Sequence, residues 1–313
     1  MDATDEHPAA DYSQEALERD LRAHGYTRVT VLDSVGSTNT WLAERVAAAP
    51  SAAPGATPAT PGDAAVPGLE AVVTGFQSTG RGRLDRQWVT PAGTAVTFSV
   101  ACTPVDAAGR PWSPELLPWL TLLMAHAVTG AVRDLTGVPA VVKWPNDVLV
   151  RDRKLCGILA TVVASGAARS VVVGAGINVS QRELPVPAAT SLRLEAPDAV
   201  PPRPALLTAV LERFADVLTR ASRDPGTELG PHGSVRMALE AELDTLGREV
   251  AVHLPGAQRP LTATATGLGA SGQLVVRERD GSVHEYSAGD VVHVRPARQA
   301  PAAAAHEPGE ARA

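Results

Sequence analysis

The chain has 313 residues, 44% of them hydrophobic and 20% charged, which suits one medium-sized domain plus a small second one. Its formal net charge of -6 argues against a general nucleic-acid binder, because such a protein needs a basic field. Cys102 and Cys156 belong to no CxxC pair and have no histidine cluster beside them, which excludes an obvious zinc site or disulfide framework. We expect two free, buried thiols in a reducing compartment.

Three segments have compositions that favour disorder or mobility. Residues 1–12 are acidic and lack the apolar stretch of a signal peptide. Residues 50–68 contain five prolines and six alanines, which predicts a mobile surface insert. Residues 298–313 are expected to be a disordered tail. The apolar runs elsewhere are interrupted well short of a membrane span, so we predict a soluble, cytoplasmic protein without a membrane partner.

In chain order, helix and strand signals alternate through the first hundred residues. Ser13 can cap a helix that carries Leu17 and Leu21 four residues apart, which predicts a helix over 13–24. The next expected elements are a strand at 28–33, a helix starting at Ser37 or Thr38, and strands at 69–77 and 94–103.

The middle of the chain continues this mixed pattern. Ser113-Pro114-Glu115 begins a helix, because proline is favoured at the first helical position, and Gly137 ends it. Further expected elements are strands at 140–144 and 147–151, a hairpin of 155–164 and 169–178, and helices at 204–222 and 233–246. Residues 13–246 are therefore predicted to form an α+β domain, a mixed β-sheet packed with helices.

From Arg248 onward the pattern changes to short alternating strands separated by glycine-rich turns. Asp280-Gly281 is a strong hairpin turn among them. About fifty residues of this kind predict a small all-β barrel over 247–297.

The loop from Gly80 to Arg86 alternates glycines with arginines. Glycines let the backbone approach a ligand closely, and Arg81, Arg83 and Arg86 carry forked donors suited to phosphate or carboxylate. A basic RNA-binding loop or a solvated turn would have a similar composition. The loop indicates an anion site only in combination with other residues.

A second candidate site lies in the strings KWPND, at 143–147, and RKLCG, at 153–157. Asp147 and Lys154 are separated by a short turn, so both can face one pocket from adjacent strands. An acid there could bind magnesium or a ribose hydroxyl, and a lysine could neutralise a transferring α-phosphate. A surface ion pair across a hairpin would show the same spacing.

Two further polar groups are weaker signals. Ser37, Thr38 and Asn39 at a helix start can bond an amide or urea-like ligand, although helix capping also explains them. The string GAGIN, at 174–178, ends a valine-rich strand, and its glycines fit either a ligand lying on the strand or tight packing. The three tryptophans near these motifs fit core packing. No Ser-His-Asp or Cys-His constellation is evident, so a covalent enzyme intermediate is not indicated.

Taken together, these strings resemble the biotin–protein ligase family. The matching strings DSVGSTNTWL, TGFQSTGRGRLDRQW, KWPNDVLV, RKLCGIL and VGAGINV occur in the family's order over residues 31 to 180. The resemblance implies the biotin ligase catalytic fold, which is similar to that of class II aminoacyl-tRNA synthetases. It also implies activation of biotin to biotinyl-5'-AMP, followed by transfer to a lysine of a biotin carboxyl carrier domain. ATP and magnesium enter as co-substrate and ion, and no prosthetic group is bound tightly.

The resemblance also implies roles for individual residues. Lys154, Arg81 and Asp147 take catalytic roles, and Asp147 is the candidate metal ligand, although the metal ligands stay unassigned. The biotin contacts it implies are Ser37, Thr38, Asn39, Gln77, Arg81, Gly82, Arg83, Lys154 and Gly157. The nucleotide contacts it implies are Arg83, Arg86, Trp88, Asn146, Lys154 and Asn178.

Three alternatives to a biotin ligase stay open. A lipoate or octanoate ligase would share the catalytic fold but should lack the GRGR-x-x-R-x-W string. A biotin-responsive regulatory protein would need a DNA-binding domain, and about thirty residues before the first expected catalytic strand are too few for one, so we expect no specific DNA binding. An RNA-binding protein is opposed by the net acidity and the scarcity of aromatic residues.

Overall fold

The structure is a computed structural model that describes residues 11–48, 68–84, 86–165, 168–254, 258–288 and 293–296. Most of the three segments expected to be disordered or mobile therefore lies outside the described residues. Asp11 and Tyr12 are an exception, because Tyr12 is buried beneath Arg203 and Asp11 pairs with that arginine at 2.5 Å. The packed chain thus begins slightly earlier than residue 13.

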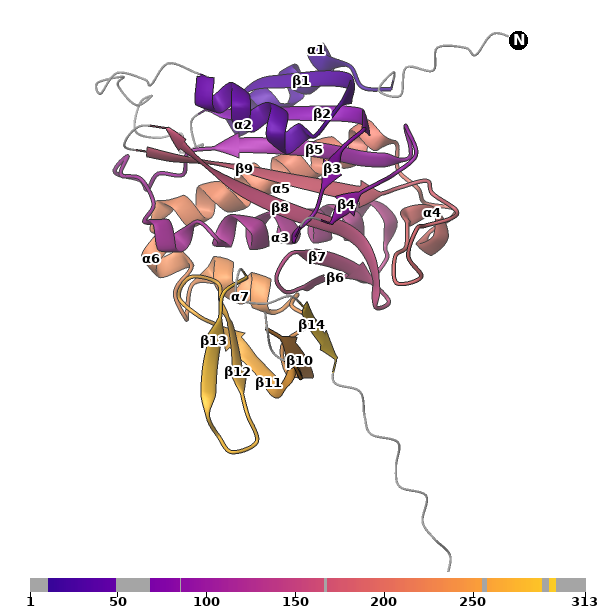
Figure 1. Ribbon diagram of the computed structural model, residues 1–313. Coiled ribbons are helices and arrows are strands. Elements are labelled where there is room, and N and C mark those ends of the chain that lie inside the picture. The colour runs from indigo at the N-terminus through magenta and orange to yellow at the C-terminus, as the bar shows by residue number, and fades with distance from the viewer. Residues whose placement is uncertain are drawn as a thin grey trace, which may run out of the picture.

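A seven-stranded mixed sheet forms the centre of the larger unit, in the order β1-β2-β5-β9-β8-β7-β6. The pair β1–β2 is parallel and every other pair is antiparallel. The predicted α+β fold with a mixed sheet is confirmed (Figure 1). The strands are β1 (Tyr26–Val35), β2 (Leu69–Gln77), β5 (Ala95–Cys102), β6 (Ala140–Lys143), β7 (Asp147–Val150), β8 (Arg153–Ser165) and β9 (Ala168–Asn178).

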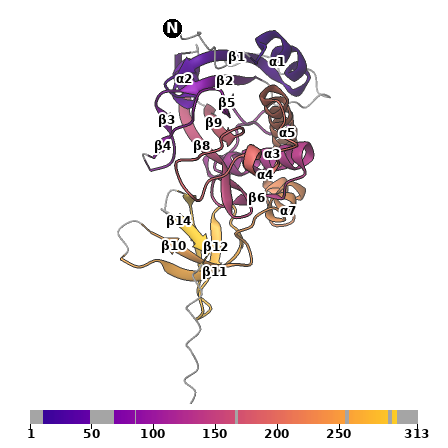
Figure 2. The same ribbon diagram turned by 90° about the vertical axis from the view of Figure 1, so that its right-hand side faces the viewer.

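Helices cover the two faces of this sheet unequally. Figure 2 shows α3 (Trp119–Thr136) and α5 (Arg203–Arg223) on one side, and α2 (Thr38–Ala48) with the small hairpin of β3 (Gly80–Arg81) and β4 (Gln87–Trp88) on the other. The remaining helical elements are α1 (Gln14–Leu21), η1 (Arg22–His24), η2 (Pro114–Leu116), α4 (Leu192–Glu195), α6 (Pro225–Glu228) and α7 (Ser234–Glu240).

The helix α3 is the core helix of the domain. Together with the preceding turn, over Pro114–Thr136, it is long and apolar enough to cross a membrane by length and composition. Of its most apolar 18-residue window, 67% is nevertheless buried inside the protein, where the helix packs against the sheet and α5. Gly137 ends the helix in the left-handed conformation, as predicted, and its N–H bonds to the Arg133 carbonyl at 2.8 Å.

The C-terminal unit is a five-stranded antiparallel sheet in the order β13-β12-β11-β10-β14. This confirms the small all-β unit expected from the alternating pattern. Its strands are β10 (Glu249–His253), β11 (Leu261–Leu268), β12 (Leu274–Arg277), β13 (Val283–Tyr286) and β14 (His293–Pro296). Two indole N–H groups hold it against the larger unit, because Trp119 donates to the Ala270 carbonyl at 2.9 Å and Trp144 to the Gly272 carbonyl at 3.0 Å.

The helix predicted over 233–246 is too long, since α7 ends at Glu240. Beyond it the backbone pairs with β6 in place of continuing the helix: Val142 N–H donates to the Glu242 carbonyl, and Asp244 N–H donates to the Val142 carbonyl, both at 2.9 Å. Tertiary pairing has overridden local propensity here.

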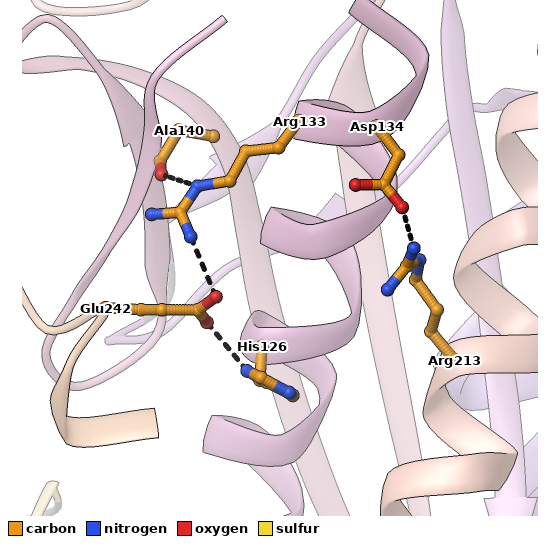
Figure 3. Close-up of polar contacts among 6 residues, drawn as sticks. All are labelled: His126, Arg133, Asp134, Ala140, Arg213 and Glu242. Atoms are coloured by element: carbon orange, nitrogen blue, oxygen red, sulfur yellow. Dashed lines mark hydrogen bonds and ion pairs between the residues drawn. The ribbon is translucent and has the colours of Figure 1, made fainter. Parts of the chain in front are cut away.

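Glu242 also fixes this connection through its side chain (Figure 3). Its carboxylate lies 2.6 Å from His126 Nδ1 and accepts from Arg133 Nη1 at 2.8 Å. Arg133 in turn donates to the Ala140 carbonyl at 2.7 Å. The segment that joins the two units is therefore anchored to α3 and to the start of β6.

Both thiols are free and buried, as expected. Burial raises the pKa of Cys102 and of Cys156 to about 12 because it disfavours the thiolate. We predict that neither reacts with a disulfide reagent such as DTNB at pH 8 in the native protein, and that two thiols per chain react after unfolding in guanidinium. Fast reaction of the native protein would contradict this burial.

Because the unfolded thiols ionise at lower pH than the folded ones, the free energy of unfolding should also fall as the pH rises above about 9.

Candidate functional site

A cavity of about 360 Å³ opens on the sheet face that carries α2 and the β3–β4 hairpin. Its walls come from the start of α2, the end of β2, the hairpin, the β6–β8 turns, the end of β9 and residues 181–189. Every candidate site residue named from the sequence lines it: Ser37, Thr38, Asn39, Gln77, Arg81, Gly82, Arg83, Arg86, Trp88, Asn146, Asp147, Lys154, Gly157 and Asn178.

The start of α2 forms one end of the cavity. Gln77 Oε1, at the end of β2, accepts from the Thr38 N–H at 2.7 Å and lies 3.0 Å from Thr38 Oγ1. Ser37 occupies the capping position, with its carbonyl accepting from the Trp41 N–H at 2.9 Å. The Ser37 hydroxyl caps the helix only weakly, since its Oγ lies 3.5 Å from the Thr40 N–H, whereas the buried side chains of Thr38 and Asn39 bond to the sheet.

Glycines on β9 let the cavity's side chains lie directly on the sheet. A Cβ at Gly174 would overlap Asn39 Oδ1, and one at Gly176 would lie 2.5 Å from the Trp88 ring. Both distances are below normal contact, so a methyl group at either position would displace a residue of the site. The glycines of the GAGIN string therefore serve tight packing, and the residues that they pack against line the cavity.

The glycine–arginine loop is a hairpin that folds across the sheet (Figure 1). Gly80 pairs with Trp88 in the β3–β4 ladder, and Gly82 N–H donates to the Arg86 carbonyl at 2.6 Å. Arg83 reaches inward to Asn146 Oδ1 at 3.4 Å and donates to the carbonyl of Ala288 in the C-terminal unit. Burial lowers the pKa of the Arg83 guanidinium, and the nearby Asp147 carboxylate opposes that shift.

Asp147 and Lys154 form the charged centre of the cavity. Lys154 Nζ lies 2.5 Å from Asp147 Oδ1 across the β7–β8 pair. The ladder has a bulge here that skips Leu155, since Cys156 pairs with Val148 while Lys154 pairs with Leu149. The bulge brings the side chain of Lys154 round to Gly157, where a Cβ would lie 3.0 Å from Nζ. The sequence spacing left two alternatives for Asp147 and Lys154, a surface ion pair or two side chains facing one pocket. The structure shows both, because the paired side chains line the cavity.

The preceding turn is held rigidly beside this pair. Asn146 Nδ2 donates to the Ile158 carbonyl at 2.8 Å, and the Ile158 N–H donates back to the Asn146 carbonyl at 2.9 Å. The Asn146 side-chain oxygen is left facing Arg83. On the neighbouring strand, Asn178 Nδ2 donates to the Thr190 carbonyl at 2.9 Å and its oxygen accepts from Gln181 at 3.1 Å. Asn178 therefore organises the loop after β9.

Sequence reasoning missed that loop, residues 179–195. It pairs with Lys154 on both sides, because the Lys154 N–H donates to the Ala188 carbonyl at 2.7 Å and its carbonyl accepts from the Thr190 N–H at 2.8 Å. At its end the fully buried carboxylate of Glu195 accepts from Arg151 at 2.5 Å and Arg153 at 2.6 Å. A signal was present in the sequence: Glu195 lies three residues after Leu192 and so shares its buried helical face.

Known protein families match this chain in two segments. Residues 64–178 match the Biotin/lipoate A/B protein ligase family, and residues 245–294 match the Biotin protein ligase C terminal domain. These matches place the chain in the class of biotin and lipoate protein ligases.

Individual relatives narrow the class. The chain is 32% identical over 289 residues to a Biotin--[acetyl-CoA-carboxylase] ligase of Mycobacterium tuberculosis, a match that covers 89% of this chain and 96% of that protein. A bifunctional ligase/repressor BirA of Escherichia coli is 32% identical over 50% of this chain and 42% of its own length. The biotin protein ligase of Aquifex aeolicus, solved in complex with biotin and ATP, superimposes with a TM-score of 0.64 and 25% identity, over 87% of this chain and 100% of that one. The chain belongs to the biotin protein ligase family.

The contact between Gly176 and Trp88 gives a prediction about the shape of the cavity. Gly176→Ala should displace the Trp88 ring and reduce ligand affinity by at least tenfold, because strand backbone cannot move away easily. Gly267→Ala is a matched control, since its Cβ would meet nothing closer than Glu240 Oε1 at 4.0 Å. Titration calorimetry with biotin measures the affinity, and circular dichroism checks the fold. Equal affinity in both variants would show that the glycine is not required.

Proposed function

We propose that the chain activates biotin with ATP to biotinyl-5'-AMP and then transfers biotin to a lysine of a biotin carboxyl carrier domain. The carrier would belong to an acyl-CoA or pyruvate carboxylase, and the reaction would take place in the cytoplasm. One observation carries the proposal: each of the five strings that resemble the ligase family, spread over residues 31 to 180, contributes residues to the wall of a single cavity. The enzyme is then a biotin–[biotin carboxyl-carrier protein] ligase, which forms a C–N bond.

The biotin end of the cavity is its polar end at α2 and β2. Ser37, Thr38, Asn39 and Gln77 offer hydroxyl and amide groups to a cyclic urea, which carries two N–H donors and one carbonyl acceptor. Gly82 and Gly157 let backbone approach the acyl chain. A plain alkyl acid has no group that could bond to the polar atoms at this end, so the composition of this end favours biotin.

The charged centre suits the first chemical step. The biotin carboxylate is already anionic, so it attacks the α-phosphorus without a general base, and the bond to pyrophosphate breaks. The barrier arises from charge repulsion and positioning, which Lys154, Arg81 and Arg83 relieve as fixed cations. Asp147 holds Lys154 in place through their 2.5 Å ion pair.

The nucleotide end lies between the hairpin and the loop after β9. We assign Arg83, Arg86, Trp88, Asn146, Lys154 and Asn178 to it. Among the described residues no group of three or more His, Cys, Asp or Glu could hold a metal ion by itself. The acids that line the cavity are Asp147 and Glu183. This donor set fits magnesium that is held mainly by phosphate and water, with Asp147 as the protein contact.

In the second step a neutral lysine amine of the carrier attacks the acyl carbon of biotinyl-AMP. The C–O bond to AMP breaks, AMP leaves as an anion, and the amine releases a proton as the amide forms. Arg81 and Arg83 stabilise the negative charge that develops on the leaving phosphate. No covalent enzyme intermediate is required.

A lipoate or octanoate ligase is the second candidate, because the family matched at residues 64–178 includes lipoate ligases. The match of residues 245–294 to the biotin protein ligase C-terminal domain favours biotin. A biotin-responsive regulatory protein is a different class of candidate, which would bind biotin without catalysing adenylation.

ATP–pyrophosphate exchange distinguishes these three candidates. With biotin, lipoate and octanoate supplied in turn, we expect exchange with biotin alone, followed by transfer of biotin to a carrier domain after it is added. Exchange with lipoate or octanoate alone would identify the second candidate. Biotin binding without any exchange would identify a regulatory protein.

Lys154→Ala should lower the rate of biotin-dependent exchange by at least 100-fold, because a fixed cation at the transferring phosphate is lost. Lys154→Arg should also stay low, since a planar guanidinium cannot replace a compact ammonium beside Gly157. Arg19→Ala is the control, because it removes an exposed cation remote from the cavity. Thermal unfolding verifies that each variant is folded. Near-normal exchange by the folded alanine variant would remove Lys154 from its role.

A further inference from the structure

Ser99 lies behind the polar end of the cavity, where α2 begins and β2 ends. It sits in the middle of β5, is fully buried and is not among the residues that line the cavity. Its Oγ lies 2.6 Å from Asn39 Oδ1 and 2.8 Å from Thr38 Oγ1. It therefore contacts two residues of the biotin end at once.

The direction of the hydrogen bond to Asn39 is fixed. Asn39 Nδ2 donates to the Leu159 carbonyl at 2.9 Å, and a carbonyl can only accept. The side-chain oxygen of Asn39 must then face Ser99. Because an amide oxygen is an acceptor, Ser99 has to donate its single proton to Asn39.

This assignment leaves the Thr38 hydroxyl proton two acceptors, Ser99 Oγ and Gln77 Oε1. With its own proton committed, Ser99 Oγ can only accept from Thr38 Oγ1 at 2.8 Å. The competing acceptor for the Thr38 proton is Gln77 Oε1 at 3.0 Å, which already accepts from the Thr38 N–H. If Thr38 also donated its hydroxyl proton there, both lone pairs of Gln77 Oε1 would be used.

We propose that Ser99 is a positioning residue that sets the hydrogen-bond polarity of the cavity's polar end. By accepting the Thr38 proton, it leaves one lone pair on Gln77 Oε1 and the lone pairs of Thr38 Oγ1 for a ligand. The end then accepts hydrogen bonds, which selects a ligand with ring N–H groups, such as a cyclic urea. This inference rests on the proposed function for the identity of that ligand.

Ser99→Ala tests the proposal. The variant sends the Thr38 proton to Gln77 and also leaves Asn39 Oδ1 without a donor. We expect the KM for biotin in ATP–pyrophosphate exchange to rise about tenfold or more, with kcat and the KM for ATP within about threefold of wild type. Titration calorimetry with biotin alone should show a matching loss of affinity.

Two substitutions at the same position separate hydrogen bonding from packing. Ser99→Cys has a similar shape but is a weak donor and acceptor, so it should also raise the KM for biotin. Ser99→Thr keeps the hydroxyl and should restore the KM to within about threefold of wild type. Ser170→Ala is the matched control, because Ser170 is also buried in the sheet and its Oγ lies 2.7 Å from Thr103 Oγ1, near the opposite end of β9.

The outcomes are distinguishable from failure of the proposed function. If the wild-type protein shows no biotin-dependent exchange, the proposed function itself is wrong. If it does, a normal KM for biotin in the alanine or cysteine variant overturns the role of Ser99. An equal rise in the KM values for biotin and ATP also overturns it, since general damage to the fold would do the same.

Discussion

The approach of α2 and the β3–β4 hairpin to bare sheet backbone is the constraint on which the site depends. Side chains at Gly174 or Gly176 would overlap Asn39 or Trp88, so both elements would be held away from the sheet. The distance between a helix and a sheet is ordinarily set by the side chains between them. Removing those side chains lets Asn39 bond to the Leu159 carbonyl and lets the Trp88 ring lie on the strand. The cavity is therefore shaped by absent side chains as much as by those present.

The same logic places the charged centre. An ordinary strand alternates its side chains between faces, so Lys154 and Gly157, three residues apart, would point to opposite faces. The bulge at Leu155 removes this conflict and brings Lys154 to Asp147. The loop after β9 then pairs with the backbone of Lys154, and Glu195 ties its end to the same β7–β8 turn through Arg151 and Arg153. The side chain of Lys154 is long and flexible, but both backbone groups of the residue are bonded to this loop and its ammonium is paired with Asp147. Such fixing suits catalysis by positioning.

Periodic signals in the sequence predicted the helices and strands well, but they could not predict contacts between residues far apart in the chain. The strand predicted at 69–77 has the same bounds as β2, because a continuous apolar run between turn residues is a local signal. The helix predicted at 233–246 ends early, because residues 242–244 pair with β6, a contact no local pattern encodes. The candidate site residues were named from the strings that resemble the family, and all of them line the cavity. Ser99 and Glu195 were not found, since their importance lies in partners distant in sequence. Their environments, with Asn39 and Thr38 for one and two arginines for the other, exist only after folding.

The C-terminal unit takes part in the same arrangement. Trp144 precedes Pro145-Asn146 at the cavity, and its indole donates to the Gly272 carbonyl of that unit. Arg83, from the hairpin, reaches Asn146 with one nitrogen and the Ala288 carbonyl with another. The hairpin and the turn before Asp147 are therefore each bonded to both units. Because a guanidinium has donors in a fixed plane, the position of Ala288 constrains the direction in which Arg83 presents its remaining donors to the cavity. The small unit thus contacts the proposed anion-binding side of the site through backbone carbonyls, and the charged groups that line the cavity all come from the larger unit.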